Sequence, residues 1–354
     1  MIKYSEENLN MIHLTLGLAC NMNCKYCYEK QSNHINSKCG SFTNNNPQIA
    51  IDYIKHLAEI RDKDCKPLKL MFWGGEPLLY FDTIKYIISE LILDYNIDYK
   101  FITNGLSLTP EIVNICNMYN IGVGLSHDGP NTIMTRHVDI LKSDYHLDLL
   151  HKINDLGINS VLSAYNYDYM STINYIRTKF KLKPNIKVHF GWLHCDNNTP
   201  KELYNYDYEV YQNNLIKYLE FVKEDLLSGN ITPELIDLLP HINRVFNPSD
   251  ENIPICSQTR RNISIDLNGN VTACHPYGNL GYIGEDLSVL QKRYDKKYNK
   301  AFNFEECKNC EILQICKAGC PFETSCEGKS SVCKIKKIFY NTLKDFFSEN
   351  ITLY

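Results

Sequence analysis

Three cysteines stand close together near the start of the chain, at Cys20, Cys24 and Cys27. Cubane iron–sulfur clusters are held by cysteine thiolates, so three thiolates at this spacing can hold three irons of a 4Fe–4S cube. No fourth cysteine is adjacent, which leaves one iron open to bind a substrate or cofactor and pass it an electron. The rival interpretations are stray thiols or a zinc knuckle, although zinc sites usually have paired C-x2-4-C ligands and a closed set of four.

The composition excludes several classes of protein. The chain has 354 residues, 44% of them hydrophobic, which is enough for one large domain and a smaller one. The net charge is −4 and no basic run stands out, so no nucleic-acid partner is expected. No apolar run is long enough to span a membrane, and the N-terminus lacks a signal peptide. The 15 cysteines are an odd number without an export signal, which favours a cytoplasmic protein whose cysteines bind metal.

Apolar runs alternate with segments of helical periodicity up to about residue 230. The predicted strands are Ile12–Leu18, Leu68–Trp73, Tyr99–Thr103, Ile121–Ser126, Ile158–Ser163 and Ile186–Trp192. The predicted helices include 49–60, 81–93, 144–156 and 204–227, and Pro110 suits the first turn of another. Six such strands predict parallel βα units and an α/β fold, a partial (β/α)6 barrel over residues 1–230. Chemistry collects at the C-terminal ends of the strands in such a barrel.

Residues 231–354 form a second region, consisting of a bridging segment and a cysteine-rich domain that metal organises. Asn268-Gly269 between two apolar runs predicts a hairpin, and residues 334–348 predict a closing helix. Seven cysteines of this region are the candidate ligands: Cys256, Cys274, Cys307, Cys310, Cys316, Cys320 and Cys333. A zinc ribbon is the alternative interpretation of this segment.

A glycine pair follows the second predicted strand, in Gly74-Gly75-Glu76-Pro77. Glycines allow a backbone to approach a ligand closely, and Glu76 supplies negative charge nearby. By itself this motif is equally consistent with a plain turn. The cysteine loop and this motif both follow predicted strands, so in a barrel they would share one mouth.

From about Ile12 to Cys333 the chain resembles the radical S-adenosylmethionine (SAM) enzymes that carry a C-terminal SPASM domain. The resemblance implies SAM and three 4Fe–4S clusters as cofactors. It implies that Gly74, Gly75 and Glu76 hold the methionyl group, and that Ser126 contacts the ribose or the carboxylate. Tyr26 would border the adenine. Asn104 is a candidate for the ribose, with a helix cap or turn as its alternative role, and Arg136 for the methionyl carboxylate, with a solvated side chain as its alternative.

The resemblance also divides the C-terminal cysteines between two auxiliary clusters. The outer cluster would use Cys307, Cys310, Cys316 and Cys333. The inner cluster would use Cys256, Cys274 and Cys320. The fourth position of the inner cluster is left open, or filled by a ligand that is not cysteine, or by recruitment of Cys195 or Cys326.

The activity that the resemblance implies is hydrogen abstraction from a residue of a peptide or protein, followed by its modification, such as a thioether or carbon–carbon crosslink. The reductant would be a flavodoxin- or ferredoxin-type protein. An anaerobic sulfatase-maturing enzyme is the first alternative, but His275 stands where that branch has its presumed Asp base, so we expect His275 to be the proton acceptor or a polar neighbour of the cluster. A multi-cluster electron-transfer protein is the alternative from another class. Only 19 residues precede Cys20, so no N-terminal leader-binding domain is expected.

Overall fold

A single sheet of nine strands, in the order β6-β5-β4-β3-β2-β1-β7-β8-β9, organises the molecule. The computed structural model describes residues 6–27, 29, 46–61, 66–183, 185–248, 261–274, 277–298, 305–320 and 326–350. Each of the first six strands pairs in parallel with its neighbour in sequence. They are β1 (Met11–Thr15), β2 (Leu68–Trp73), β3 (Ile97–Thr103), β4 (Gly122–Ser126), β5 (Leu156–Leu162) and β6 (Lys187–Trp192). The predicted strands and the α/β partial barrel are thus confirmed, with ends shifted by a few residues.

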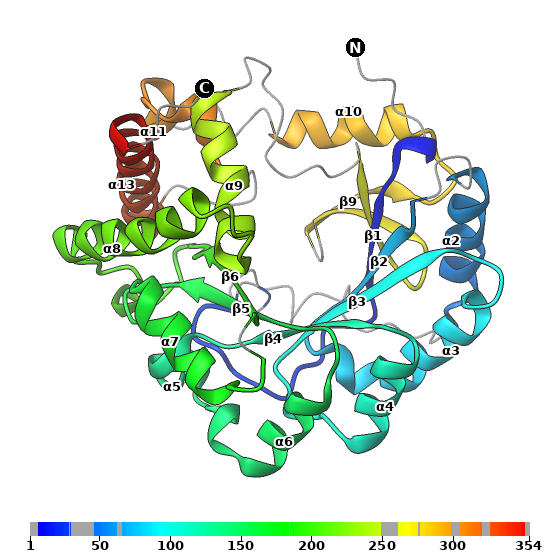
Figure 1. Cartoon of the computed structure of the whole chain (residues 1–354). Helices are drawn as coiled ribbons and strands as arrows, with labels where there is room; N and C mark the ends of the chain where they lie inside the picture. Colours follow the sequence, from blue (N-terminus) through cyan, green and yellow to red (C-terminus); the bar gives the residue numbers. More distant parts are fainter. Residues whose placement is uncertain are drawn as a thin grey trace.

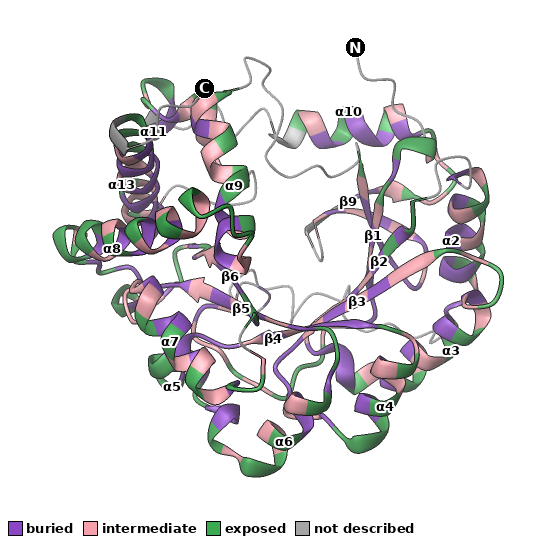
Figure 2. Cartoon of the chain, viewed as in Figure 1, coloured by how far each residue is buried: buried purple, intermediate pink, exposed green. Residues whose placement is uncertain are grey.

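Helices connect these strands and lie along the outer side of the curved sheet (Figure 1). They are α2 (Gln48–Arg61), α3 (Phe81–Leu91), α4 (Pro110–Met118), α5 (Thr132–Arg136), α6 (Asp144–Lys152) and α7 (Tyr169–Lys179). Their apolar residues recur every three or four positions, as in α3, where Phe81, Ile84, Ile88 and Leu91 are buried. This spacing turns one face of the helix to the sheet and leaves the other exposed, as the purple and green bands of Figure 2 show.

The start of α4 follows from its sequence. The Thr109 side chain accepts a hydrogen bond from the backbone N–H of Ile112 at 3.3 Å, and Pro110 occupies the first turn. Thr caps one of the unpaired N–H groups of a helix start, and Pro lacks the N–H that would be unpaired there. The position expected for Pro110 is therefore confirmed.

The predicted hairpin extends the main sheet. β7 (Asn262–Asp266) pairs in parallel with β1, and then antiparallel with β8 (Asn270–Cys274), which pairs with β9 (Tyr277–Tyr282). Gly269 has φ of +82°, a conformation that glycine adopts without steric cost, and it makes the turn between β7 and β8. The pairing of β7 with β1 brings residues 251 positions apart side by side, which no local pattern in the sequence indicates. The boundary at residue 230 remains a prediction.

β6 is an edge strand of the sheet, and helices from the second half of the chain cover its outer edge. Asp237 in α9 (Pro233–Phe246) accepts a hydrogen bond from the backbone N–H of Phe190 at 3.5 Å and contacts His189 of the same strand at 2.5 Å. Covering an edge in this way removes unpaired N–H groups that would otherwise template aggregation. The long helix α8 (Tyr208–Leu227) begins after its cap Asp207, four residues later than expected.

The C-terminal part contains α10 (Leu287–Tyr298), α11 (Glu305–Lys308), α12 (Leu313–Cys316) and α13 (Glu327–Asn350). The last of these is longer than the predicted closing helix, and it packs on α8 and α9. Phe339 of α13 contacts Trp192 at the end of β6, with ring centroids 5.3 Å apart. In the described part of the chain, no helix combines the length and the apolar character needed to cross a membrane.

Candidate functional site

The motifs singled out in the sequence gather at one edge of the sheet. The cysteine loop follows β1, Gly74 follows β2, Asn104 follows β3, and Ser126 is the last residue of β4. Because these four strands are parallel and adjacent, their C-terminal ends lie together. The structure therefore places these residues at the C-terminal ends of the strands, the edge at which the sequence predicts the chemistry.

The cysteine loop and the glycine motif are joined through their backbones. The N–H of Gly75 donates to the carbonyl oxygen of Gly17, and that of Glu76 donates to Ala19, each at 2.9 Å. A Cβ atom added at Gly75 would lie 2.4 Å from the carbonyl oxygens of both Leu18 and Ala19. The close approach of the two backbone segments therefore requires glycine at position 75. The two backbone bonds continue the β1–β2 pairing into the site.

Glu76 fastens the glycine motif to the next strand. Its side chain is buried, and Oε1 accepts hydrogen bonds from Thr103 Oγ1 at 2.6 Å and from the N–H of Leu78 at 3.1 Å. Oε2 accepts from the N–H of Asn104 at 2.8 Å. Burial raises the pKa of this carboxyl group above its usual value, while the three donors act in the opposite direction. The carboxylate thus holds the ends of β2 and β3 in register.

Asn104 bonds to the cysteine loop. Its side-chain N–H donates to Asn21 Oδ1 at 2.8 Å and lies 3.9 Å from Cys20 Sγ, while its Oδ1 accepts from the N–H of Leu106. Asn104 therefore has the turn role that was its alternative interpretation, and its side chain also contacts Cys20, the first cysteine of the loop. The sequence did not single out Asn21 as a partner for it.

Tyr26 and Arg136 both bond to the carboxylate of Asp128, a residue that the sequence analysis did not identify. Asp128 is fully buried and accepts hydrogen bonds from Tyr26 at 2.6 Å, Thr135 at 2.6 Å and Arg136 Nε at 3.1 Å. The guanidinium of Arg136 also lies over the Tyr26 ring, 5.2 Å from its centroid. Arg136 is therefore the buried ion-pair partner of Asp128. The alternative prediction, that its side chain is solvated, is wrong.

A second buried polar group lies behind Ser126. Nδ1 of His127 accepts a hydrogen bond from the N–H of Gly129 at 3.1 Å, so the ring hydrogen is on Nε2, 3.0 Å from Asp139 Oδ1. Tyr175 donates to the other oxygen of Asp139 at 2.7 Å. Burial raises the pKa of Asp139, but the bonds from His127 and Tyr175 outweigh it and lower this pKa to about 2. The half-buried Ser126 is thus followed by a rigid turn.

Four C-terminal cysteines line one cavity of about 230 Å³. They are Cys307, Cys310, Cys316 and Cys333, the four expected to hold the outer cluster. Lysines of α13 contribute most of the remaining polar lining. Within the described ranges, no three His, Cys, Asp or Glu side chains are close enough to hold a single metal ion.

The inner set is described only in part. Cys274 ends β8, and Cys320 follows the short helix α12; both are half-buried. Cys256 and His275 lie outside the described residues. The predicted inner ligands and the predicted role of His275 therefore remain predictions.

Two further cysteines, Cys195 and Cys326, lie near the start of α13. The N–H of Lys329 donates to Cys326 Sγ at 3.4 Å. A Cβ added at Gly328 would lie 2.9 Å from Sγ of the buried Cys195. Burial raises the pKa of the Tyr204 hydroxyl, Glu327 raises it further, and Cys195 and Cys326 contribute smaller effects in the same direction. The two candidates for recruitment to the inner cluster thus lie beside the same helix turn.

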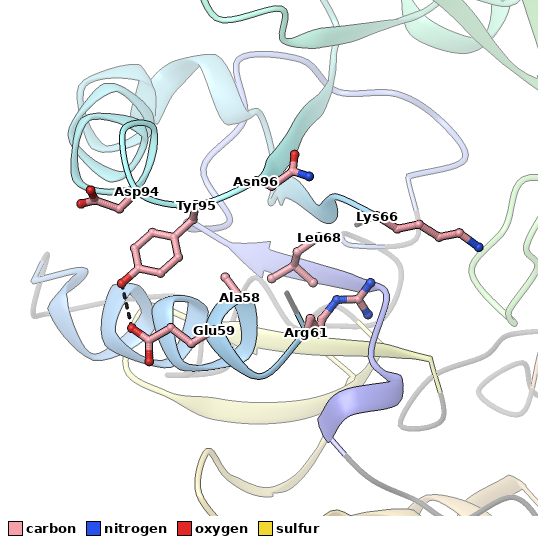
Figure 3. A pocket seen from close by; sticks show the side chains of 8 residues that line it. All are labelled: Ala58, Glu59, Arg61, Lys66, Leu68, Asp94, Tyr95 and Asn96. Atoms are coloured by element: carbon pink, nitrogen blue, oxygen red, sulfur yellow. Dashed lines mark hydrogen bonds between the residues drawn. The ribbon is translucent and has the colours of Figure 1, made fainter. Parts of the chain in front are cut away.

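A shallow pocket lies at the opposite edge of the sheet (Figure 3). Leu68 begins β2 and Asn96 precedes β3, so this pocket lies at the amino ends of the strands. The Tyr95 hydroxyl donates to Glu59 across its rim at 2.9 Å, as the dashed line marks. Its position separates it from the edge that carries the cysteine loop and the glycine motif.

A family profile described as the radical SAM superfamily matches residues 14–177. The radical SAM cyclopropyl synthase TigE of Paramaledivibacter caminithermalis is 31% identical over 333 residues, which cover 89% of this chain and 68% of that protein. The chain belongs to the radical SAM superfamily. A cysteine-type anaerobic sulfatase-maturating enzyme of Clostridium novyi is 24% identical over 379 residues, covering 98% of this chain and 96% of the relative.

Two solved structures share the fold of this radical SAM protein. Native anSMEcpe with bound AdoMet and Kp18Cys peptide has a TM-score of 0.66 and 18% identity, covering 96% of this chain and 99% of that one. Streptococcus suis SuiB bound to the precursor peptide SuiA has a TM-score of 0.56 and 18% identity, covering 89% of this chain and 72% of that one. The predicted family and its cofactor SAM, with the 4Fe–4S cluster of radical SAM chemistry, are thus confirmed.

The residues of the cysteine loop fit a radical SAM cluster. Cys20 is exposed, and Cys24 and Cys27 are half-buried, so all three thiols are accessible at the edge of the sheet. The guanidinium of Arg136 interacts electrostatically with Cys24, and cysteine ligates iron as the thiolate. Asp128, which holds Arg136 and Tyr26 together, could have been suspected from its place after a strand end and before Gly129, whose φ is +75°.

Proposed function

We propose that this radical SAM enzyme abstracts hydrogen from a residue of a peptide substrate and then forms a carbon–carbon bond there. The single observation that carries the radical step is the joining of the cysteine loop to the Gly75–Glu76 backbone at the edge where Ser126 ends β4. The bond type is supported by the cyclopropyl synthase that is 31% identical over most of the chain. Two neighbours in fold that hold peptides support the class of substrate.

When bound, a 4Fe–4S cluster and SAM would supply the hydrogen-abstracting radical, the most demanding part of the chemistry. Cys20, Cys24 and Cys27 would hold that cluster. Carbonyl groups and the carboxylate at Gly74–Glu76 would accept hydrogen bonds from the methionyl amine, because a protonated amine only donates. Ser126 and Asn104 would contact the ribose from neighbouring strand ends.

Arg136 has a more limited role in this proposal than its residue type alone suggests. Its Nε and Nη2 atoms face Asp128 at 3.1 and 3.5 Å, which occupies one side of its planar fork. The remaining side can still meet the methionyl carboxylate. Its firmer role is to hold Tyr26, which lies between two of the cluster cysteines, against the end of β4.

We further propose two auxiliary 4Fe–4S clusters in the C-terminal region, three in all. Cys307, Cys310, Cys316 and Cys333 would hold the outer one, supported by their shared cavity. An inner cluster on Cys256, Cys274 and Cys320 would have an iron open to a substrate thiolate, since thiolates are usual ligands of such irons. A flavodoxin- or ferredoxin-type protein would supply the electrons.

Sulfatase maturation is the second candidate, favoured by relatives that align over almost their full length. The two candidates are separated by incubating reconstituted enzyme with SAM, a reductant, and either a candidate precursor peptide or a sulfatase Cys peptide. The proposal expects 5′-deoxyadenosine and a precursor product that has lost two hydrogen atoms without incorporating oxygen. Formylglycine in the sulfatase peptide, with an unchanged precursor, would favour the maturase. Reversible reduction without any 5′-deoxyadenosine would favour an electron carrier.

The number of clusters has its own test. Three cubanes contain about twelve irons per chain. Cys310→Ala should lower the iron content by about one third, because it removes a ligand of the outer cluster. About four irons in the unsubstituted protein would leave the first cluster alone and contradict the auxiliary pair. Zinc in place of iron at the C-terminal cysteines would support a zinc ribbon.

A further inference from the structure

The cavity lined by the four outer cysteines also contains lysines. Lys329 and Lys336 are only 3% and 8% exposed, whereas Lys334 stands exposed at the rim. All three extend from α13, the helix that carries Cys333. The residues of the described chain that line the cavity include neither Asp nor Glu.

Buried ammonium groups need negative charge close by. Taking a lysine charge out of water costs several kcal/mol unless an opposite charge compensates it. Among the described residues that line this cavity, the groups that can carry negative charge are the cysteine thiols. A cubane bound by four thiolates has a net negative charge, and its reduction adds one more negative charge. Fixed positive charge therefore stabilises the reduced form more than the oxidised form.

The position of Lys336 is held by its surroundings. Its Nζ atom lies over the Trp192 ring, 5.8 Å from the centroid, and Trp192 is in turn packed against Phe339 of the same helix. Trp192 is the last residue of β6, so this lysine of the cavity lining also contacts the barrel. A cation over an aromatic face is attracted by the ring.

From these contacts we infer that Lys329 and Lys336 raise the reduction potential of the cluster held by Cys307, Cys310, Cys316 and Cys333. The inference rests on the proposed outer cluster and assigns these two lysines a role in it. The outer cluster then accepts an electron more readily than the same four cysteines would allow without the lysines. Hydrogen bonding and charge around the sulfurs are known determinants of such potentials.

The test is a redox titration, followed by electron paramagnetic resonance, of protein in which Cys20, Cys24 and Cys27 are replaced by Ala. This background removes the first cluster, and the signal lost on Cys310→Ala identifies the outer one. Lys329→Met and Lys336→Met should each change the ratio of reduced to oxidised outer cluster at least tenfold at a fixed potential. That change equals a decrease of about 59 mV for a one-electron couple.

Two control variants show whether the effect comes from buried charge. Lys329→Arg keeps the charge and should keep the potential, and Lys344→Met removes an exposed lysine of α13 that does not line the cavity. An unchanged potential in both Met variants at full iron content would overturn the inference, and so would an equal decrease with Lys344→Met. Iron content unaffected by Cys310→Ala would instead contradict the proposed outer cluster.

Discussion

Tyr26 donates a buried hydrogen bond of 2.6 Å to Asp128, joining the cysteine loop to the loop after β4. These residues are 102 positions apart in the sequence. Asp128 also accepts from the N–H of Val161 in β5 at 3.0 Å. One carboxylate therefore connects the cysteine loop, the loop after β4 and strand β5.

Asp128→Asn should destabilise the protein more than Tyr26→Phe does. Loss of the Tyr26 hydroxyl removes one hydrogen bond to a charged group, about 1.5–3 kcal/mol of unfolding free energy. Loss of the Asp128 charge leaves the buried Arg136 without its partner, a cost of about 3–5 kcal/mol. Urea unfolding of both variants measures the order, with Tyr95→Phe, whose hydroxyl lies at the surface, as a control without effect. A larger loss in Tyr26→Phe would contradict the central role of Asp128.

Gly75→Ala should displace the glycine motif from the cysteine loop. The added methyl group would lie 2.4 Å from two carbonyl oxygens, so the backbones must separate. We expect a loss of about 1–3 kcal/mol in stability and weaker SAM binding. The matched control is Gly157→Ala in β5, where the nearest atom would be 3.7 Å away. Calorimetric titration with SAM and thermal unfolding measure both effects, and equal behaviour of the two variants would rule out the close approach as the reason for glycine.

Asp139 should make the fold sensitive to acid. Its pKa falls from 3.8 to about 2, because the bonds from His127 and Tyr175 outweigh the opposing effect of burial. A carboxyl group with a lower pKa in the folded state stabilises the fold above its unfolded pKa, and this contribution is lost as the pH falls toward about 2. The unfolding free energy of Asp139→Asn should therefore fall less steeply than that of the unsubstituted protein between about pH 4 and pH 2. Parallel curves in urea unfolding would contradict the assignment.

Replacement of Cys20, Cys24 and Cys27 by Ala should abolish 5′-deoxyadenosine formation while the C-terminal cysteines keep their iron. The reason is that these three cysteines belong to the loop that is bonded to the glycine motif at the edge of the sheet. Chromatography of reaction mixtures and iron analysis make the measurement. Continued SAM cleavage by the triple variant would remove the cysteine loop from the mechanism.

His275→Ala distinguishes a base from a polar neighbour of the cluster. If His275 accepts the substrate proton, the variant should still cleave SAM and keep its clusters but lose most product, since positioned proton transfer contributes about 10²–10⁴-fold. The ratio of product to 5′-deoxyadenosine is the decisive quantity. An unchanged ratio would leave His275 only a structural role.

The sequence alone was enough to predict the βα alternation, the strand ends at Trp73, Thr103 and Ser126, and the motifs that follow them. Helix starts such as Thr109-Pro110 were also predictable. Apolar periodicity and helix capping act over a few residues, so these features can be predicted from the sequence alone. Parallel βα order then implies a shared edge without any further information.

Only the tertiary structure decided which distant groups meet. The pairing of β7 with β1, the bonds from Tyr26 and Val161 to Asp128, and the lysines of α13 beside Cys307 all join segments far apart in the chain. Nothing in the local pattern around Asp128 or Lys329 specifies these partners. Long-range neighbours are selected by the burial of a whole core and by the need of each buried polar group for a partner, and both are properties of the folded molecule.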